Sequence, residues 1–197
     1  ITDHRTWIVG DSFVRRAGKG SPQLQGCGRV TWLGLGGDRV VALLDRLRGL
    51  LRIGPSPHTI MLHVGSNDIF AASKKVLCEV VELLLKSLRQ VLPGCQLIWS
   101  HILPRLFWYG ERNPGAGEKV RKEVNRCAYA TCKALSGDNR VIFHHGINGC
   151  DHSLYEPRDG VHLSPKGFCV FRDQIQGAIR YFNATPGTLI GYPPLDR

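Results

Sequence analysis

The sequence TWIVGDSFVRR, residues 6–16, passes from a short apolar stretch into Gly10-Asp11-Ser12 and then becomes basic. The apolar residues predict a buried strand that ends just before the glycine. A serine at such a place is either the N-cap of a helix or a nucleophile at the edge of a sheet. The residues that follow the other predicted strands bear on the choice between the two.

Apolar stretches alternate with helical patterns along the rest of the chain. The strand candidates are residues 5–10, 29–35, 58–65, 95–103 and 140–146. The helix candidates are residues 37–52, 73–92, 117–135 and 164–182. Strands joined by helices of this length favour a parallel sheet with helices on both faces. We therefore predict an α/β fold with a five-stranded parallel sheet over residues 1–182, followed by a tail or linker at 183–197.

Residues that directly follow the strands of such a sheet are candidates for function, because ligands bind beyond the carboxyl ends of the strands. Four groups of small and polar residues stand at these places. They are Gly10-Asp11-Ser12, Gly34-Leu35-Gly36-Gly37-Asp38, Gly65-Ser66-Asn67-Asp68 and, after a longer loop, Asp159-Gly160-Val161-His162. We expect all four to gather along one edge of the sheet.

Each group has a plain structural explanation when it is taken alone. Ser12 fits a helix N-cap, the glycines fit ordinary turns, and Asn67 with Asp68 fits an Asx turn and an N-cap. Asp159 and His162 fit a polar pair in a surface loop. The case for a functional site therefore rests on the four groups occurring together.

Together the four groups supply what acyl transfer requires. Ser12 would be the nucleophile, His162 the base that takes its proton, and Asp159 the carboxylate that orients the imidazole. The backbone N–H groups of Ser12 and Gly37, with the side-chain amide of Asn67, would stabilise the oxyanion. This chemistry needs no metal ion and no cofactor.

These residues resemble the signature of the SGNH (GDSL-type) hydrolase family. The family has a serine in GDS, a glycine, an asparagine in GxND, and DxxH. This chain has GDS at 10–12, GGD at 36–38, GSND at 65–68 and DGVH at 159–162. No single block is specific, but the ordered set of four is, and it spans nearly the whole chain.

The resemblance implies a three-layer α/β/α sandwich of the flavodoxin-like kind and an esterase activity. It gives the family's roles to Ser12, Gly37, Asn67, Asp159 and His162. The family usually has a leucine after the GDS serine, whereas this chain has a phenylalanine there, which keeps an apolar side chain.

A narrower resemblance concerns two longer stretches, TWIVGDSFVRRA and DGVHLSPKGF. They are similar to short basic esterase domains in the first-open-reading-frame protein of some vertebrate LINE retrotransposons. This resemblance implies an esterase or lipase-like activity in a protein that works together with nucleic acid.

Two further segments border the expected edge. The loop after the fourth strand contains Phe107, Trp108 and Tyr109, which either anchor the loop on the core or form an apolar wall for the acyl group. We take these aromatic residues as candidates for binding an ester with an apolar acyl group. Arg15 and Arg16 lie just past the serine and either face solvent or attract an anionic headgroup.

The chain carries a formal net charge of +10, which favours phosphates or anionic lipid headgroups as neighbours. The charge is dispersed, so solvated helix faces explain it at least as well. If the charge serves phosphate contacts, we expect RNA or anionic lipid to bind the helix at 117–135, away from the catalytic cleft. The residues expected there are Lys119, Arg121, Lys122 and Arg126.

The seven cysteines are odd in number and form no CxxC, which predicts reduced thiols in a cytoplasmic protein, or in one of the nucleus or a ribonucleoprotein particle. The spacing of Cys127, Cys132, His144, His145 and Cys150 matches no familiar zinc pattern. No apolar run approaches the roughly 20 residues of a membrane-spanning helix.

Two classes of function remain. The first is a serine esterase acting on short-chain acyl or acetyl esters, lipid esters included. The complete set of Ser12, Asp159 and His162 favours this class. The second is a scaffold of the same fold that binds RNA, an anionic membrane or a protein partner, with catalysis incidental or lost.

Overall fold

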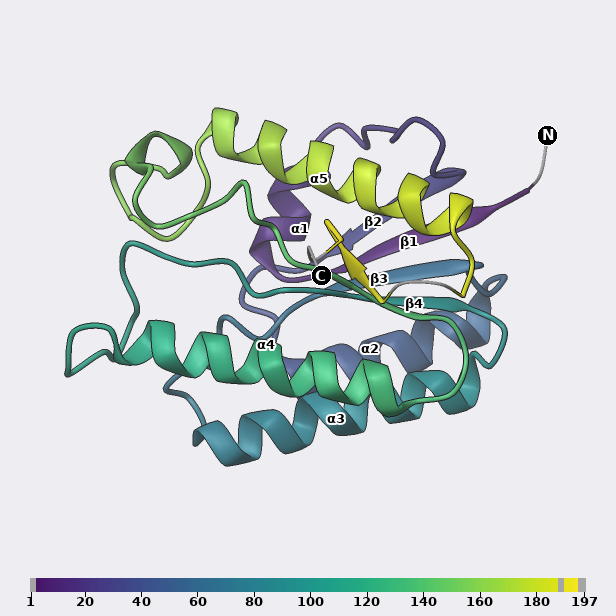
Figure 1. The fold of residues 1–197 in the computed structure, drawn as a ribbon, viewed down its shortest axis with the longest axis horizontal. Helices are drawn as coiled ribbons and strands as arrows, with labels where there is room; N and C mark the ends of the chain where they lie inside the picture. The colour runs from purple at the N-terminus through teal and green to yellow at the C-terminus, as the bar shows by residue number, and fades with distance from the viewer. Residues whose placement is uncertain (1–2, 188–189, 195–197) are drawn as a thin grey trace.

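A parallel sheet lies between two layers of helices in the computed structural model, which describes residues 3–187 and 190–194 (Figure 1). The strands are β1 (Arg5–Gly10), β2 (Arg29–Gly34), β3 (Thr59–His63), β4 (Gln96–Ser100), β5 (Asn139–Ile142) and β6 (Gly191–Tyr192). The helices are α1 (Ser12–Ala17), α2 (Val40–Ile53), α3 (Lys74–Val91), α4 (Ala116–Ala134), the short 3-10 helix η1 (His152–Leu154) and α5 (Pro165–Ala184). The predicted α/β/α sandwich is confirmed.

The sheet has six parallel strands in the order β2-β1-β3-β4-β5-β6, so the prediction of five strands is wrong. The additional strand pairs Gly191 and Tyr192 with Val141 and Ile142 at one edge of the sheet. It lies within residues 183–197, which we predicted to be a tail or linker, and α5 extends two residues into the same stretch. Positions 188–189 and 195–197 of that stretch lie outside the described residues.

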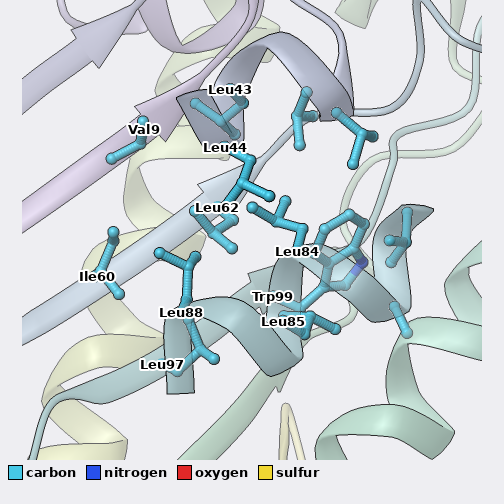
Figure 2. Close-up of a cluster of buried hydrophobic side chains, with 14 of the residues drawn as sticks. Val9, Leu43, Leu44, Ile60, Leu62, Leu84, Leu85, Leu88, Leu97 and Trp99 are labelled. Atoms are coloured by element: carbon cyan, nitrogen blue, oxygen red, sulfur yellow. The ribbon is translucent and has the colours of Figure 1, made fainter. Parts of the chain in front are cut away.

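Both faces of the sheet are apolar, because successive side chains of a strand point to opposite faces and helices cover both. On one face, strand residues pack with α1 and α5; they include Ile8, Met61, Ile98 and Ile142. On the other face, α2 and α3 contribute leucines; Figure 2 shows Leu43, Leu44, Leu84, Leu85 and Leu88 around Val9, Ile60, Leu62, Leu97 and Trp99. Each fully buried side chain of this kind contributes about 1.5–3 kcal/mol.

The strand order creates a reversal next to β1. The chain leaves β1 for its neighbour β2 and then returns to the other side of β1 to form β3. In open parallel sheets, the crevice for a ligand forms beyond the carboxyl ends of the strands at such a reversal. The fold therefore places the ends of β1, β2 and β3 around one crevice.

Two buried histidines, His63 and His144, and the half-buried His101 lie under this edge of the sheet. The Ser100 hydroxyl lies 2.9 Å from Nδ1 of His63 and 2.6 Å from Nε2 of His144. His101 packs edge-on against Phe143, and its Nε2 is buried without a hydrogen-bond partner. Burial lowers the pKa of His101 to about 3, that of His144 to about 4, and that of His63 well below its usual value.

We expect the free energy of unfolding to fall as the pH drops from 7 to 5. These histidines stay neutral in the folded protein, whereas in the unfolded chain they bind protons below about pH 6.5. Below that pH, each of them lowers the free energy of unfolding by up to about 1.4 kcal/mol for every pH unit. Burial of Asp11 and Asp68 raises their pKa to about 6, so these two carboxyls oppose the trend below that pH without cancelling it. Urea unfolding at pH 7 and at pH 5 measures the slope of the free energy of unfolding against pH.

His101→Phe should reduce this slope, because phenylalanine keeps the ring contact with Phe143 and removes both the titration and the unpartnered nitrogen. Val41→Ala on the exposed face of α2 supplies the control, since it changes no titratable group and should leave the slope as it is. An unchanged slope in His101→Phe would show that this ring does not take part in the acid sensitivity.

Candidate active site

The structure brings the four groups predicted from the sequence to one edge of the sheet. Ser12 follows β1, Gly37 follows β2 and Asn67 follows β3. Asp159 and His162 lie in the long loop between β5 and α5. All four groups stand at the carboxyl ends of strands, around the reversal between β1 and β3.

A chain of hydrogen bonds joins three of these side chains. The Ser12 hydroxyl lies 3.0 Å from Nε2 of His162, and Nδ1 of the same ring lies 2.8 Å from Oδ2 of Asp159. Ser12 is the first residue of α1 and is not its N-cap; Asp11 takes that place, with its Oδ1 accepting the N–H of Phe13 at 3.0 Å. The serine hydroxyl is therefore free of a capping role and can face the imidazole.

The Asp159 carboxylate is held in one orientation by its own loop. Its Oδ1 accepts the backbone N–H groups of Val161 and His162 at 2.9 and 3.0 Å, which leaves Oδ2 for the imidazole. Partial burial raises the pKa of Asp159, but the hydrogen bonds from His162 and Val161 outweigh burial and lower the pKa to about 2. The carboxylate is therefore ionised at any pH at which the protein is expected to work.

Donors gather on the other side of the Ser12 hydroxyl. Gly37 has a φ of 76°, a left-handed conformation that glycine adopts without strain, so the glycine is required by the backbone. The Asn67 amide donates to the carbonyl of Asp38 at 3.1 Å, which fixes the side chain and leaves its second N–H available. Among the described residues, the backbone N–H groups of Ser12 and Gly37 have no hydrogen-bond acceptor.

Asn67 and Asp68 have different partners. Asp68 accepts the N–H of Val40 at the first turn of α2 through its Oδ2 at 3.2 Å. Asp68 thus satisfies one N–H at the start of α2 without being the N-cap of that helix, a position that Arg39 occupies. The cap of the following helix, α3, is Ser73.

A buried polar network lies beneath the serine. Ser66 donates to Oδ2 of Asp11 at 2.8 Å and accepts a hydrogen bond from Nη2 of Arg105 at 2.6 Å. Burial lowers the pKa of Arg105, and the nearby carboxylates of Asp11 and Asp159 act in the opposite direction. The network ties the loop after β3 and the loop after β4 to the start of α1.

Sequence reasoning missed Arg105. Its guanidinium lies over two aromatic rings, 5.4 Å from the ring centre of Phe13 and 5.2 Å from that of Trp108. Phe13 in turn packs against the imidazole of His162, with the ring centres 5.6 Å apart. A single basic residue within the apolar and aromatic stretch LPRLFWYG was the available signal.

The three aromatic residues of this loop have different positions. Trp108 is buried in the core and does not line the groove at the serine; a Cβ on Gly117 would lie 2.5 Å from its ring, so the glycine makes room for it. Phe107 and Tyr109 are exposed and pack edge to face. Of the three, Tyr109 reaches the groove. The N–H of Phe107 donates to the carbonyl of Gly160, so this loop is bonded to the loop of Asp159 and His162.

A groove of about 430 Å³ opens over the Ser12 hydroxyl. Its walls include Gly37, Asn67, Tyr109, Val161, His162, Arg15, Arg16 and Arg105. A larger hollow of about 560 Å³ lies around the start of β5, at the opposite edge of the sheet, and contains no serine or histidine. Within the part of the chain that the structure describes, no group of three or more His, Cys, Asp or Glu residues is placed to hold a metal ion.

Comparisons with known proteins identify the family and support the fold. The model of the GDSL-like Lipase/Acylhydrolase family matches residues 8–168 of the chain. A GDSL-like lipase from Bacteroides thetaiotaomicron superposes with a TM-score of 0.71 at 16% identity, over 91% of this chain and 89% of that one. A psychrotrophic esterase from Pseudoalteromonas sp., in a structure inhibited by monoethylphosphonate, gives a TM-score of 0.68 at 17% identity, over 93% and 100%.

A lipase/acylhydrolase from Enterococcus faecalis is similar as well, with a TM-score of 0.62 at 18% identity over 90% of this chain and 96% of that one. At such low identity, these solved structures establish the fold alone. The search of curated proteins finds no match for the chain.

Proposed function

The chain belongs to the GDSL-like lipase/acylhydrolase family, and we propose on that premise that it is a serine esterase with Ser12, His162 and Asp159 as its catalytic residues. The observation that carries the proposal is the chain of hydrogen bonds from Ser12 through His162 to Asp159 at 3.0 and 2.8 Å. The substrates we propose are carboxylic esters of short acyl groups, acetyl esters and lipid esters included.

The reaction follows from these contacts. His162 takes the proton of Ser12 through Nε2 while the serine oxygen attacks the ester carbonyl, and Asp159 stabilises the imidazolium that forms. The alcohol leaves with the proton from His162, and the acyl group stays on Ser12. The same imidazole then removes a proton from a water molecule that attacks the acyl group, which releases the acid and restores the serine.

The oxyanion of each tetrahedral intermediate would lie among three donors, the N–H groups of Ser12 and Gly37 and the amide of Asn67. Donors fixed in advance stabilise a developing charge without reorganising during the reaction. The hydrogen bond from Asn67 to the Asp38 carbonyl and the left-handed conformation of Gly37 support this assignment, because both fix a donor in place.

Asn67→Ala should lower kcat by about 10²-fold with little change in KM, because an oxyanion donor acts mainly in the transition state. Steady-state kinetics with an aryl acetate measures the effect, and circular dichroism checks that the variant is folded. Asn183→Ala on the exposed end of α5 is the matched control. A loss confined to KM would remove Asn67 from the oxyanion site.

Covalent labelling tests the proposed activity without knowledge of the natural ester. A fluorophosphonate should react with the protein in the absence of added metal, and mass spectrometry of the digest should find the adduct on Ser12. An adduct on another residue, or none, would contradict the proposal. Monoethylphosphonate inhibition of the similar esterase from Pseudoalteromonas sp. supports the choice of reagent.

The alternative function, a scaffold that binds RNA or anionic lipid through α4, receives less support. Arg121 makes two bonds to Glu118 and one to the carbonyl of Ile102, and Arg126 pairs with Glu123. Much of the positive charge on α4 is thus matched within the helix. The resemblance to retrotransposon esterase domains, with its link to nucleic acid, stays a prediction.

The cellular setting is also a proposal. All seven cysteines are free, and Cys27, Cys95 and Cys132 are buried. Free thiols support a reducing compartment such as the cytoplasm. Over the residues that the structure describes, none of the helices has the combined length and apolar character that crossing a bilayer requires.

A further inference from the structure

The charged side chains that line the groove over Ser12 are arginines. Three arginines line it, namely Arg15, Arg16 and Arg105, and no carboxylate is among its lining residues. The acidic groups nearby are already engaged: Asp38 pairs with Arg46, and Asp159 is bonded to His162. A molecule in the groove therefore meets the guanidinium groups of Arg15 and Arg16, which form no ion pair among the described residues, and beside them the more deeply placed Arg105.

Arg105 is the buried member of the three. Only 9% of its surface is exposed, its guanidinium lies over the rings of Phe13 and Trp108, and its Nε is buried without a partner. The hydrogen bond that it donates goes to the neutral hydroxyl of Ser66. It forms no direct ion pair among the described residues, and the carboxylates of Asp11, on the far side of Ser66, and of Asp159 offset its charge only from a distance.

Arg15 and Arg16 extend this charge from the buried wall to the rim. Both follow Ser12 on α1, both are exposed, and neither forms an ion pair with a carboxylate of the described residues. The Arg15 guanidinium lies over the loop of the oxyanion glycine, since a Cβ on Gly36 would stand 3.3 Å from its Cζ. The two arginines thus stand on the α1 and β2 side of the groove, next to the proposed reaction centre.

We propose that the ester hydrolysed in this groove carries an anionic oxygen group, a carboxylate or a phosphate, which Arg15, Arg16 and Arg105 bind. The proposal rests on the proposed esterase function and names the class of its substrate. Guanidinium groups suit this task because their planar N–H donors match carboxylate and phosphate oxygens in pairs. The apolar acyl group expected from the sequence then has Tyr109 and Val161 as its contacts on the same groove.

The kinetic test compares two acetyl esters of nearly equal size that differ in charge, 4-acetoxybenzoate and 4-acetoxybenzamide. We expect kcat/KM to be about tenfold or more higher for the benzoate, the scale of one charge-assisted hydrogen bond. The ratio of the two constants should shrink as the ionic strength rises from about 0.01 M to 1 M, because salt screens charges at the exposed rim.

The double variant Arg15→Gln with Arg16→Gln should lower the ratio by about tenfold through the loss of both rim charges. Arg105→Gln should lower it as well, but this change removes a buried contact to Ser66, so its melting temperature must be measured alongside. If Arg105→Gln does not fold, the double variant decides, because both of its positions are exposed. Arg52→Gln, at the far end of α2, removes one exposed charge as the control and should leave the ratio unchanged.

Two phosphorylated esters distinguish the possible sources of the anion. Acetylglycerol phosphate is a soluble ester, and lysophosphatidate in phosphatidylcholine vesicles presents the same group as a lipid headgroup. Each is compared with its unphosphorylated counterpart. Preference for the first phosphorylated ester identifies a soluble substrate, and preference for the second alone identifies a lipid.

A binding measurement separates this proposal from the esterase function. Titration calorimetry with the products, 4-hydroxybenzoate and 4-hydroxybenzamide, requires no turnover. Tighter binding of the benzoate that is lost in the double variant supports the anion site even if neither ester is hydrolysed. Equal binding of the two products, or a preference that the arginine variants leave intact, overturns the proposal whatever the turnover.

Discussion

Ser12→Ala is expected to lower kcat for an aryl acetate by about 10³-fold or more while the protein stays folded. The hydroxyl that is removed lies 3.0 Å from the imidazole of His162, and no other hydroxyl is hydrogen-bonded to that ring among the described residues. The variant keeps the N-cap of α1, because Asp11, and not Ser12, accepts the N–H of Phe13 there. Initial rates at saturating ester and a thermal melt measure the two effects.

The control for this change is Ser87→Ala on α3, which removes a hydroxyl from a helix on the opposite face of the sheet. It should leave both turnover and melting temperature nearly unchanged. Wild-type turnover in Ser12→Ala would assign the hydrolysis to another group. A large drop in melting temperature would instead show that the hydroxyl supports the fold.

Local patterns predicted the four long helices and the five longer strands because each of these elements is long enough to show a period, whereas the short helices α1 and η1 were not among the predicted elements. Residues 5–10, for example, were predicted as a strand and form β1 with the same bounds. β6 could not be found in this way, because its two residues have no period and pair with β5 only after α5 has brought the chain back. The sixth strand is thus a tertiary feature.

The candidate site, too, could be predicted from the sequence only in part. The positions of Ser12, Gly37 and Asn67 follow from strand ends, which a sequence shows. Which residues surround them depends on contacts between distant segments. Arg105, for example, contacts Phe13 across 92 residues of chain. In the same loop Trp108 is buried in the core, whereas Phe107 and Tyr109 beside it are exposed.

Asp159→Asn should lower kcat by about 10³- to 10⁴-fold while leaving Ser12 and His162 in place. The reason lies in the loop. Oδ1 of Asp159 accepts two backbone N–H groups, so an asparagine must keep its carbonyl oxygen there and turn its NH₂ group toward Nδ1 of His162. Nδ1 then has to accept a hydrogen bond, which places the ring proton on Nε2.

An imidazole with its proton on Nε2 cannot take the proton of Ser12, so the variant should lose turnover without losing ester binding. Its fluorophosphonate labelling should slow to a similar degree, whereas an equilibrium titration with the product acid should be unchanged. Asp151→Asn on the exposed side of η1 is the matched control, because Asp151 also accepts a backbone N–H, that of Ser153, and lies outside the groove. Turnover close to wild type in Asp159→Asn would mean that the carboxylate does not set the tautomer of His162, and another group would then have to orient the ring.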